Sequence, residues 1–357
     1  MPLSLEASAS RRTAVWCVAL FSAFVAAGLA GRHRIHRRWL MVALLTAGLF
    51  EVLYGGKLWI ERATTLWGAG IPGGEGRLRG TFVNSNHLAL YLNLALAATF
   101  AWLWWSYRRS QRMLDWDRRV LVIAPPLIVW LTLFLGLAFT KSRAGLLSAL
   151  LGTLVQALLV PTRTPLEPSS GPLGRLTYGK PRRKRLLVGG GLGLVGLAVV
   201  AAIGSQEAAS RWQLPSLQGI ESNRRLQVYS KTLGLWSQFP LTGTGLGSFR
   251  DGFPLVQPPG LVEEWHHAHN DWLELLATTG IIGTGLFLAG LGMLLRRLAR
   301  VLADGRRTED RAAALAALGA MAAVGVHSFF DFGLTMPATA FTLVVLLGSA
   351  AGARLRH

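Results

Sequence analysis

The sequence predicts an all-α protein: a polytopic bundle of transmembrane helices. Of its 357 residues, 51% are hydrophobic and only 15% are charged, a balance too apolar for a soluble enzyme of this size. It contains many apolar runs of about 20 residues, the length that crosses the roughly 30 Å hydrocarbon layer as a helix. These runs are continuous, whereas strands of a membrane barrel alternate and are about 10 residues long. A helical bundle is therefore expected.

The apolar windows give about nine candidate spans, with their charged flanks setting the orientation. Four segments are dense in Lys and Arg: 32–38, 108–119, 161–185 and 296–311. Because cytosolic loops carry such excess, we place all four in the cytosol, with the N-terminus outside and the C-terminus inside. The net charge of +19 then reflects membrane sorting rather than nucleic-acid binding. The windows are 14–31, 39–55, 86–106, 120–140, 143–160, 186–204, 273–295, 312–330 and 337–353.

We expect one integral-membrane domain in three parts. Residues 1–204 hold the N-terminal transmembrane helices, with a cytosolic linker at 161–185 that is rich in Pro, Ser and Gly. Residues 205–270 form an extracytoplasmic, periplasmic segment, and 271–357 hold the C-terminal helices. The first window resembles a signal peptide, but the basic flank that follows it favours a retained span. Cys17 is the only cysteine, which excludes an internal disulfide.

Arginines persist on the side where sorting disfavours them, which suggests an anion-binding role. The alternative is that they occur in outer loops by chance, paired with Glu207, Glu221, Glu263 and Glu264. Lys141 and Arg143 flank a very short turn between two spans, and Arg143 is expected to begin a helix. The outer arginines are Arg62, Arg77, Arg79, Arg143, Arg211, Arg224, Arg225 and Arg250.

Two further outer stretches carry polar groups. Asn84, Asn86 and His87 stand at the mouth of the third span, where they can bind sugar hydroxyls or a phosphate, or simply cap the helix, with Asn84 or Ser85 as N-cap. From 223 to 239, apolar residues recur at helical spacing and predict a helix lying flat on the bundle or bilayer: Leu226, Tyr229, Leu233 and Trp236. Pro240 ends it, and the glycines of 241–248 predict a tight turn.

The densest polar cluster is His266, His267 and His269, directly before an apolar helix. Asp271 reads as the helix N-cap, with Glu274 three residues on. The helix N-terminus favours an anion and disfavours a charged imidazole nearby, so a neutral His269 beside a phosphate site is one interpretation. A solvated, interfacial cap is the other. Further on, His327 and Asp331 are four residues apart on one helix face, which favours a hydrogen-bonded pair over a proton relay.

Several segments together resemble the O-antigen ligase and polymerase family of bacterial membrane glycosyltransferases. The family signature is a histidine followed by Asn, Ser or Gln, then nine residues, then Gly-x-x and a residue that is Gly, Thr or Tyr. Here His269-Asn270 and Gly280-Ile-Ile-Gly283 fit it. Also similar are the stretches Gly80–His87, Ser142–Gly145, Arg225–Gly247 and His327–Asp331, in the family's order. The nine windows are fewer than the roughly twelve spans common in relatives.

The resemblance implies transfer of a glycan from an undecaprenyl-diphosphate carrier to an acceptor, such as lipid A core, at the outer face of the cytoplasmic membrane, with no metal or other cofactor. By position, Arg143 and Arg225 match arginines that hold the diphosphate, and His269 matches the essential histidine. The remaining residues expected to contact substrate are Arg224, Lys141, Arg79, Asn84, Asn86, His87, His267, Asn270, Asp271, Gly280 and Gly283.

Residue chemistry agrees with this expectation. Arginines give bidentate contacts to phosphate oxygens, and a neutral histidine can accept a hydroxyl proton, or orient the acceptor by a hydrogen bond. A polymerase that joins lipid-linked repeat units uses the same donor and is not distinguished by these motifs. A transporter of a lipid-linked anionic glycan is the rival from another class, but it predicts charged or broken helices at the bilayer middle.

Overall fold

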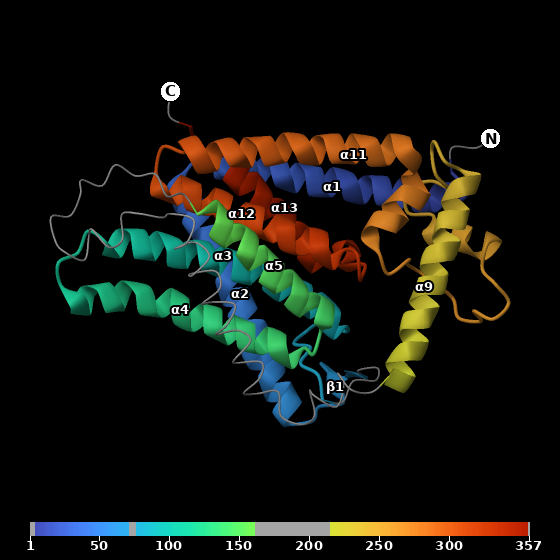
Figure 1. Cartoon of the computed structure of the whole chain (residues 1–357), viewed down its shortest axis with the longest axis horizontal. Coiled ribbons are helices and arrows are strands. Elements are labelled where there is room, and N and C mark those ends of the chain that lie inside the picture. The colour runs from blue at the N-terminus through green and yellow to red at the C-terminus, as the bar shows by residue number, and fades with distance from the viewer. Residues whose placement is uncertain (1–3, 71–75, 161–214, 356–357) are drawn as a thin grey trace.

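The computed structural model describes residues 4–70, 76–160 and 215–355, and it confirms the all-α bundle (Figure 1). Eight long helices coincide with eight of the predicted windows; the window 186–204 and the linker 161–185 lie outside the described residues. The long helices are α1 (Ala7–Ala30), α2 (Arg34–Ile60), α3 (Ser85–Ser110), α4 (Trp116–Phe139), α5 (Arg143–Leu159), α11 (Asp271–Asp304), α12 (Thr308–His327) and α13 (Pro337–Ala351).

The other described elements are short or lie apart from the bundle. They are α9 (Pro215–Gln238), α10 (Phe249–Gly252), the 3₁₀ turns η1 (Phe253–Leu255) and η2 (Gly333–Thr335), and the small hairpin β1 (Thr65–Leu66) and β2 (Ala69–Gly70). By length and composition, α1, α2, α3, α4 and α11 are long and apolar enough to cross a membrane, and α5 and α13 are shorter apolar helices. The total of nine spans stays a prediction.

Helix α3 is the centre of the bundle, packed against α4, α5 and α12. Most of its residues are buried, which is unusual for one helix and places it away from lipid. Small residues allow close approach: a Cβ on Gly145 of α5 would lie only 2.6 Å from that of Ala89. The Asn93 amide of α3 donates to the Gly145 carbonyl at 3.1 Å. Close backbone contact and buried polar bonds of this kind are what hold membrane helices together.

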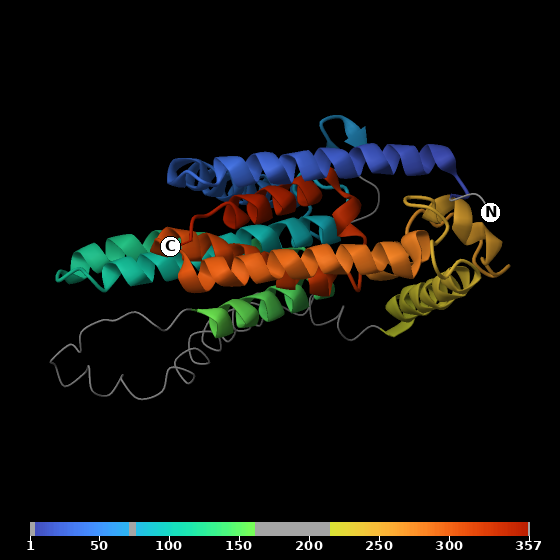
Figure 2. The ribbon, with the colours of Figure 1, turned by 90° about the horizontal axis from the view of Figure 1, so that it is seen from above.

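Basic segments gather at one end of the bundle, the end that holds the C-terminus in Figure 1. Arg37 forms a buried ion pair with Asp310 and donates to the Gly31 carbonyl, and Arg38 pairs with Glu309. The two predicted cytosolic segments 32–38 and 296–311 therefore meet, and Figure 2 shows the α3–α4 connection toward the same side. We call this the basic end.

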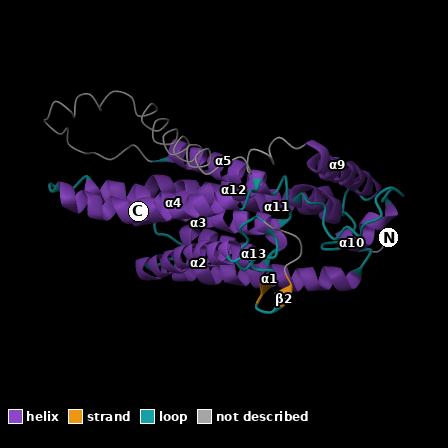
Figure 3. Cartoon of the chain, turned by 90° about the horizontal axis from the view of Figure 1, so that it is seen from below, coloured by secondary structure: helices purple, strands orange, loops and turns teal. Residues whose placement is uncertain are grey.

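Helix α9 crosses the opposite end, roughly perpendicular to the long helices (Figure 1). It includes the predicted 223–239 helix, but a different face is buried: Val228, Thr232 and Leu235 are each at most 1% exposed. Val228 packs with Phe249, Phe253, Leu261 and Ala268 in a small second core. The loops that contribute to this core lie beside α9 and α10 in Figure 3. Leu226 and Leu233 of the predicted apolar row remain exposed, which suits a helix with one face on the protein and another toward a bilayer.

Helix α11 is broken at Gly280, whose φ of 61° and ψ of −170° are not helical. Such a break leaves backbone N–H and C=O groups of α11 without partners inside the helix. The glycine-rich turn 240–247 provides hydrogen-bond partners for these groups. Thr244 and Gly245 N–H donate to the carbonyls of Ala277 and Thr278, while Ile281 N–H donates to the Pro240 carbonyl. A Cβ at Gly280 would collide with the Leu241 carbonyl. The turn predicted from the glycines is thus a fixed joint rather than a loose connection.

Candidate active site

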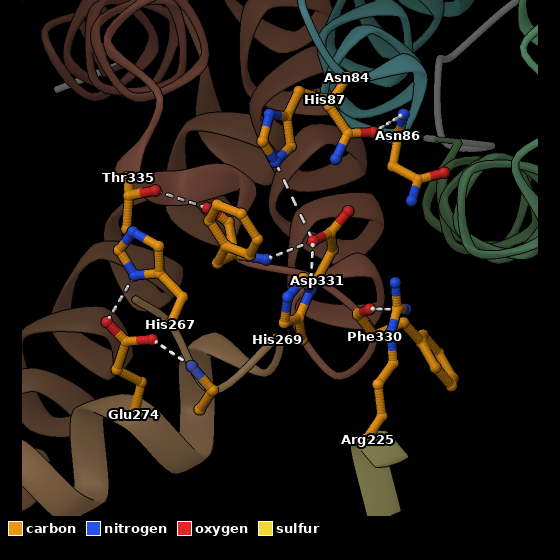
Figure 4. A network of polar contacts seen from close by, with 12 residues as sticks. Asn84, Asn86, His87, Arg225, His267, His269, Glu274, Phe330, Asp331 and Thr335 are labelled. Carbon is orange, nitrogen blue, oxygen red and sulfur yellow. Dashed lines mark hydrogen bonds and ion pairs between the residues drawn. The ribbon is translucent and has the colours of Figure 1, made fainter. Parts of the chain in front are cut away.

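Asp331 is the centre of a polar cluster at the end opposite the basic end (Figure 4). It follows α12, and its side chain is 1% exposed. Its Oδ1 lies 3.5 Å from His269 Nδ1 and 4.0 Å from His87 Nε2, and accepts the Phe332 backbone N–H at 3.0 Å. One buried carboxylate is therefore shared by histidines from α3 and from the loop before α11.

Phe332 fixes the directions of three imidazoles. Its ring stacks on His267, with centroids 4.4 Å apart and planes at 17°, and meets the edges of His87 and His269 at 4.9 and 4.7 Å. Ala268, between two of these histidines, points the other way and is fully buried in the small second core. The alternation of His267, Ala268 and His269 therefore presents both imidazoles to Phe332.

His269 has a left-handed backbone, with φ of 52°, a conformation that costs of order 1–3 kcal/mol for a residue other than glycine and is concentrated at functional sites. The Tyr229 hydroxyl of α9 donates to the His269 carbonyl at 2.8 Å. Asn270 then caps α11, its Oδ1 accepting from Leu273 N–H at 3.1 Å. The strained residue is therefore held from both α9 and α11, with its side chain 24% exposed.

The contacts between carboxylates and histidines in this cluster shift the pKa values of both kinds of group. Burial by itself would raise the pKa of the Asp331 carboxyl, but His269, His87 and His327 outweigh it and lower that pKa to about 2. Burial lowers the pKa of His267, and the Glu274 carboxylate, 2.9 Å from its Nδ1, more than compensates, so the net pKa is raised. The site therefore combines a persistent carboxylate with one histidine biased toward its charged form.

Arg225 reaches this cluster from α9. Its Nη1 donates to the Phe330 carbonyl at 3.2 Å (Figure 4), beside Asp331, and this is its only hydrogen bond or ion pair within the described part of the chain. The neighbouring Arg224 forms an ion pair with Glu263, and Arg250 pairs with Glu264 at 2.5 Å. Pairing with acidic neighbours, the alternative to anion binding, is thus observed for Arg224 and Arg250 but not for Arg225.

The turn between α4 and α5 lies at the same end. Ser142 caps α5, its Oγ accepting from Gly145 N–H at 3.1 Å, and Arg143 begins the helix as predicted. Arg77 joins this turn to α3, because its guanidinium donates to the Thr140 carbonyl and to Asn86 Oδ1, both at 2.9 Å. Lys141 has a left-handed φ of 52°.

The predicted polar groups at the start of α3 are used in different ways. Asn84 is the N-cap, its Oδ1 accepting from Asn86 N–H at 2.8 Å, so the capping role is confirmed. Arg79 donates to the Val83 carbonyl at 3.3 Å. Only His87 of this group is directed at Asp331.

Two details near α11 differ from expectation. The N-cap is Asn270, not Asp271; Asp271 instead accepts from the Ser328 hydroxyl at 2.8 Å, which ties α11 to the end of α12. Glu274 reaches back past the cap and accepts from Ala268 N–H at 2.9 Å. Of the three histidines, only His266 fits the prediction of a solvated cap, because its side chain is 54% exposed and lies beside Glu264.

His327 and Asp331 do not form the expected hydrogen-bonded pair. His327 is completely buried, and both its ring nitrogens lack a hydrogen-bond partner in the described chain. The helix ends at His327, so the spacing of four no longer places the two side chains on one helical face. Asp331 turns instead toward His269 and His87.

Four contributors to the cluster were not among the predicted site residues: Asp331, Phe332, Tyr229 and Glu274. Asp331 was visible only as a possible partner of His327, and Tyr229 only as part of an apolar row. Their contacts join segments distant in sequence, which no local pattern indicates.

A model of the O-antigen ligase family matches residues 127–288. That stretch holds Arg143, Arg225, His269 and the broken helix at Gly280, while His87 and Asp331 lie outside it. Compared with the curated proteins, the chain finds no match. The matched segment includes three of the five stretches that carry the motif resemblance, those around Arg143, Arg225 and His269, and over it the chain is similar to the O-antigen ligase/polymerase family.

Proposed function

We propose that this protein is a metal-independent glycosyltransferase that moves a glycan from an undecaprenyl-diphosphate carrier to an acceptor, lipid A core, at the periplasmic face of the bacterial cytoplasmic membrane. The observation that carries the proposal is the buried Asp331 carboxylate set 3.5 Å behind His269 Nδ1, with Arg225 beside it. A buried carboxylate behind an imidazole is the arrangement that orients a histidine for proton transfer.

His269 takes the proton in this mechanism. The acceptor hydroxyl oxygen attacks the anomeric carbon of the donor sugar, the bond from that carbon to the diphosphate oxygen breaks, and the hydroxyl proton passes to His269 Nε2. The Asp331 carboxylate, 3.5 Å from Nδ1, favours the tautomer with its proton on that nitrogen and stabilises the imidazolium that results. Positioned bases of this kind contribute roughly 10²- to 10⁴-fold.

Arg225 and Arg143 receive the leaving group. The departing diphosphate gains negative charge, and guanidinium groups contact phosphate oxygens in a bidentate way that lysine does not reproduce. Arg225 retains N–H groups for this purpose, since among the described residues it contacts only the Phe330 carbonyl. The membrane orientation follows from the positive-inside rule: with the basic end in the cytosol, the Asp331 cluster faces the periplasm.

The test is reconstitution of the purified chain in lipid vesicles with a lipid-linked glycan donor, supplied with lipid A core or with a second lipid-linked repeat unit as acceptor. Transfer to lipid A core supports the ligase, whereas chain extension of the carrier-linked repeat indicates the polymerase. Movement of the donor across the bilayer without any new glycosidic bond would contradict both.

Variants locate the chemistry. His269→Ala, Arg225→Ala and Arg143→Ala should each abolish transfer while the protein stays folded in the membrane, and Arg225→Lys should also be impaired. Arg250→Ala is the matched control, because its guanidinium is exposed and already paired with Glu264; it should retain transfer. Near-normal transfer by all three site variants would refute the assignment.

A further inference from the structure

A cavity of about 690 Å³ lies between α2, α3, α12 and α13, and the mechanism above does not use it. Its volume is within the range of about 300–1,000 Å³ typical of ligand sites. On α3 its lining extends from Tyr91 to Trp105, which at 1.5 Å per residue is about 21 Å of helix. That length exceeds half of the roughly 30 Å hydrocarbon layer, the depth of one leaflet.

The walls are apolar and the cavity is open to the outside. Met41, Leu44, Leu45 and Leu346 contribute aliphatic surface. Val42, also in the lining, is 50% exposed, so the cavity is a groove on the lipid-facing side of α2. A groove of this form accepts a hydrocarbon chain.

Guanidinium groups stand at the mouth, at the basic end. Arg34 lines the groove, is exposed, and has no hydrogen bond or ion pair among residues 4–70, 76–160 and 215–355. Arg38 pairs with Glu309, but its side chain remains 52% exposed. Arg37, beneath them, is already satisfied by Asp310 and the Gly31 carbonyl. Positive charge is thus available where a chain in the groove would place its headgroup.

We propose that this groove binds an anionic phospholipid of the cytoplasmic leaflet, its acyl chain along the apolar wall and its phosphate at Arg34 and Arg38. Basic pockets between transmembrane helices on the cytoplasmic side bind such headgroups. The proposal rests on the same membrane orientation as the proposed function, but on none of its chemistry. The glycan carrier is disfavoured as occupant, because its diphosphate would react at the Asp331 cluster, at the other end of the bundle from Arg34.

The experiment is native mass spectrometry of the full chain in detergent, titrated with dioleoyl phosphatidylglycerol, with the neutral dioleoyl phosphatidylcholine, or with undecaprenyl phosphate. Phosphatidylglycerol should bind most tightly. Arg34→Gln with Arg38→Gln should weaken it roughly tenfold to thirtyfold, since each basic residue near an anionic headgroup contributes about fivefold. Ala43→Phe, at an exposed position in the lining, should lower occupancy by filling the groove.

Two controls keep the result specific. Arg32→Gln removes a nearby exposed arginine that does not line the groove and should bind as the wild type does. His269→Ala should also bind phosphatidylglycerol normally, so that a failed transfer mechanism and a failed lipid site are distinguishable. Thermal unfolding of Ala43→Phe checks its fold, and the Arg34/Arg38 variant tests the site independently.

The proposal is overturned if phosphatidylcholine binds as tightly as phosphatidylglycerol, or if the double arginine variant keeps wild-type affinity. It is also overturned if undecaprenyl phosphate is the preferred ligand, which would make the groove part of the donor site. A dimer in which a second copy covers α2 and excludes lipid would overturn it as well.

Discussion

The two ends of the bundle treat buried polar groups in opposite ways. At the basic end most of them are matched, Arg37 with Asp310 and Arg297 with the carbonyls of Ala351 and Ala353, and Glu309 Oε2 is the exception among the described residues. Around Asp331 they are not. His87 Nε2, His269 Nδ1, Asp331 Oδ2 and both ring nitrogens of His327 have no hydrogen-bond partner in the described chain.

An unmatched buried polar group costs about 1–3 kcal/mol, and native proteins retain few of them. Their concentration around Asp331, together with the left-handed His269, supports the proposal that this end carries the chemistry, whereas the buried Arg37–Asp310 pair of the basic end contributes to stability. Substitutions at the two ends should therefore separate transfer from stability.

Of the substitutions that compare the two ends, Asp331→Asn is expected to have the largest effect on transfer. The amide keeps the shape but cannot stabilise an imidazolium, so turnover should fall by roughly 10²- to 10⁴-fold. Some thermal stability should be lost as well, because a carboxyl whose pKa is lowered to about 2 stabilises the folded state when it is ionised. Turnover in the vesicle assay and thermal unfolding in detergent measure the two quantities. Asp310→Asn is the matched change at the basic end, and it should lower the unfolding midpoint while turnover stays unchanged. Equal losses of turnover in both variants would contradict the difference between the two ends.

Much of this difference was predictable from sequence. The basic segments marked one end, and the windows located eight of the described helices. The cap at Asn84 and the helix start at Arg143 followed from local rules, since a cap depends on its nearest neighbours. The motif also identified His269 and Arg225.

Contacts between residues that are distant in the sequence could not be predicted from it. Asp331 is far along the chain from His269 and His87, and its spacing to His327 suggested a pair that the end of α12 abolishes. Asn270 and Asp271 are both good caps, so the choice depended on Ser328, which engages Asp271. Glycines in membrane helices are common, so the break at Gly280 becomes apparent only with the 240–247 turn in place.

Arg37→Met tests the stabilising end. Removing one partner leaves Asp310 as an unpaired buried carboxylate, and breaking such a pair costs about 3–5 kcal/mol. The thermal unfolding midpoint in detergent should fall, while turnover per folded molecule stays unchanged. Arg37→Met combined with Asp310→Leu should recover part of the loss, because no charge is left unpaired, although the Arg307 N–H loses Asp310 as its acceptor. If the double variant is as unstable as the single one, the ion pair is not what holds this end together.

Gly280→Ala sharpens the comparison at the joint beneath the site. A side chain at φ of 61° is strained, and its Cβ would collide with the Leu241 carbonyl, so we expect a loss of about 1–3 kcal/mol. Gly285→Ala is the control on the same helix: it is exposed, its Cβ meets nothing within 4 Å, and it should be neutral or slightly stabilising. Equal unfolding midpoints for the two variants would show that the 240–247 turn moves to accommodate a Cβ at position 280 at little cost in free energy.

His267 gives the smallest expected effect and the one that depends on pH. Because Glu274 raises the folded pKa of His267 above the ordinary value of about 6.5, its contribution to stability is fully present below about pH 6.5 and is lost as pH rises through the raised value. Unfolding midpoints of wild type and His267→Gln, measured from about pH 5 to about pH 8, should therefore converge toward the alkaline side. His266→Gln, at an exposed position, should leave the wild-type slope unchanged; a slope that survives in His267→Gln would assign it to another group.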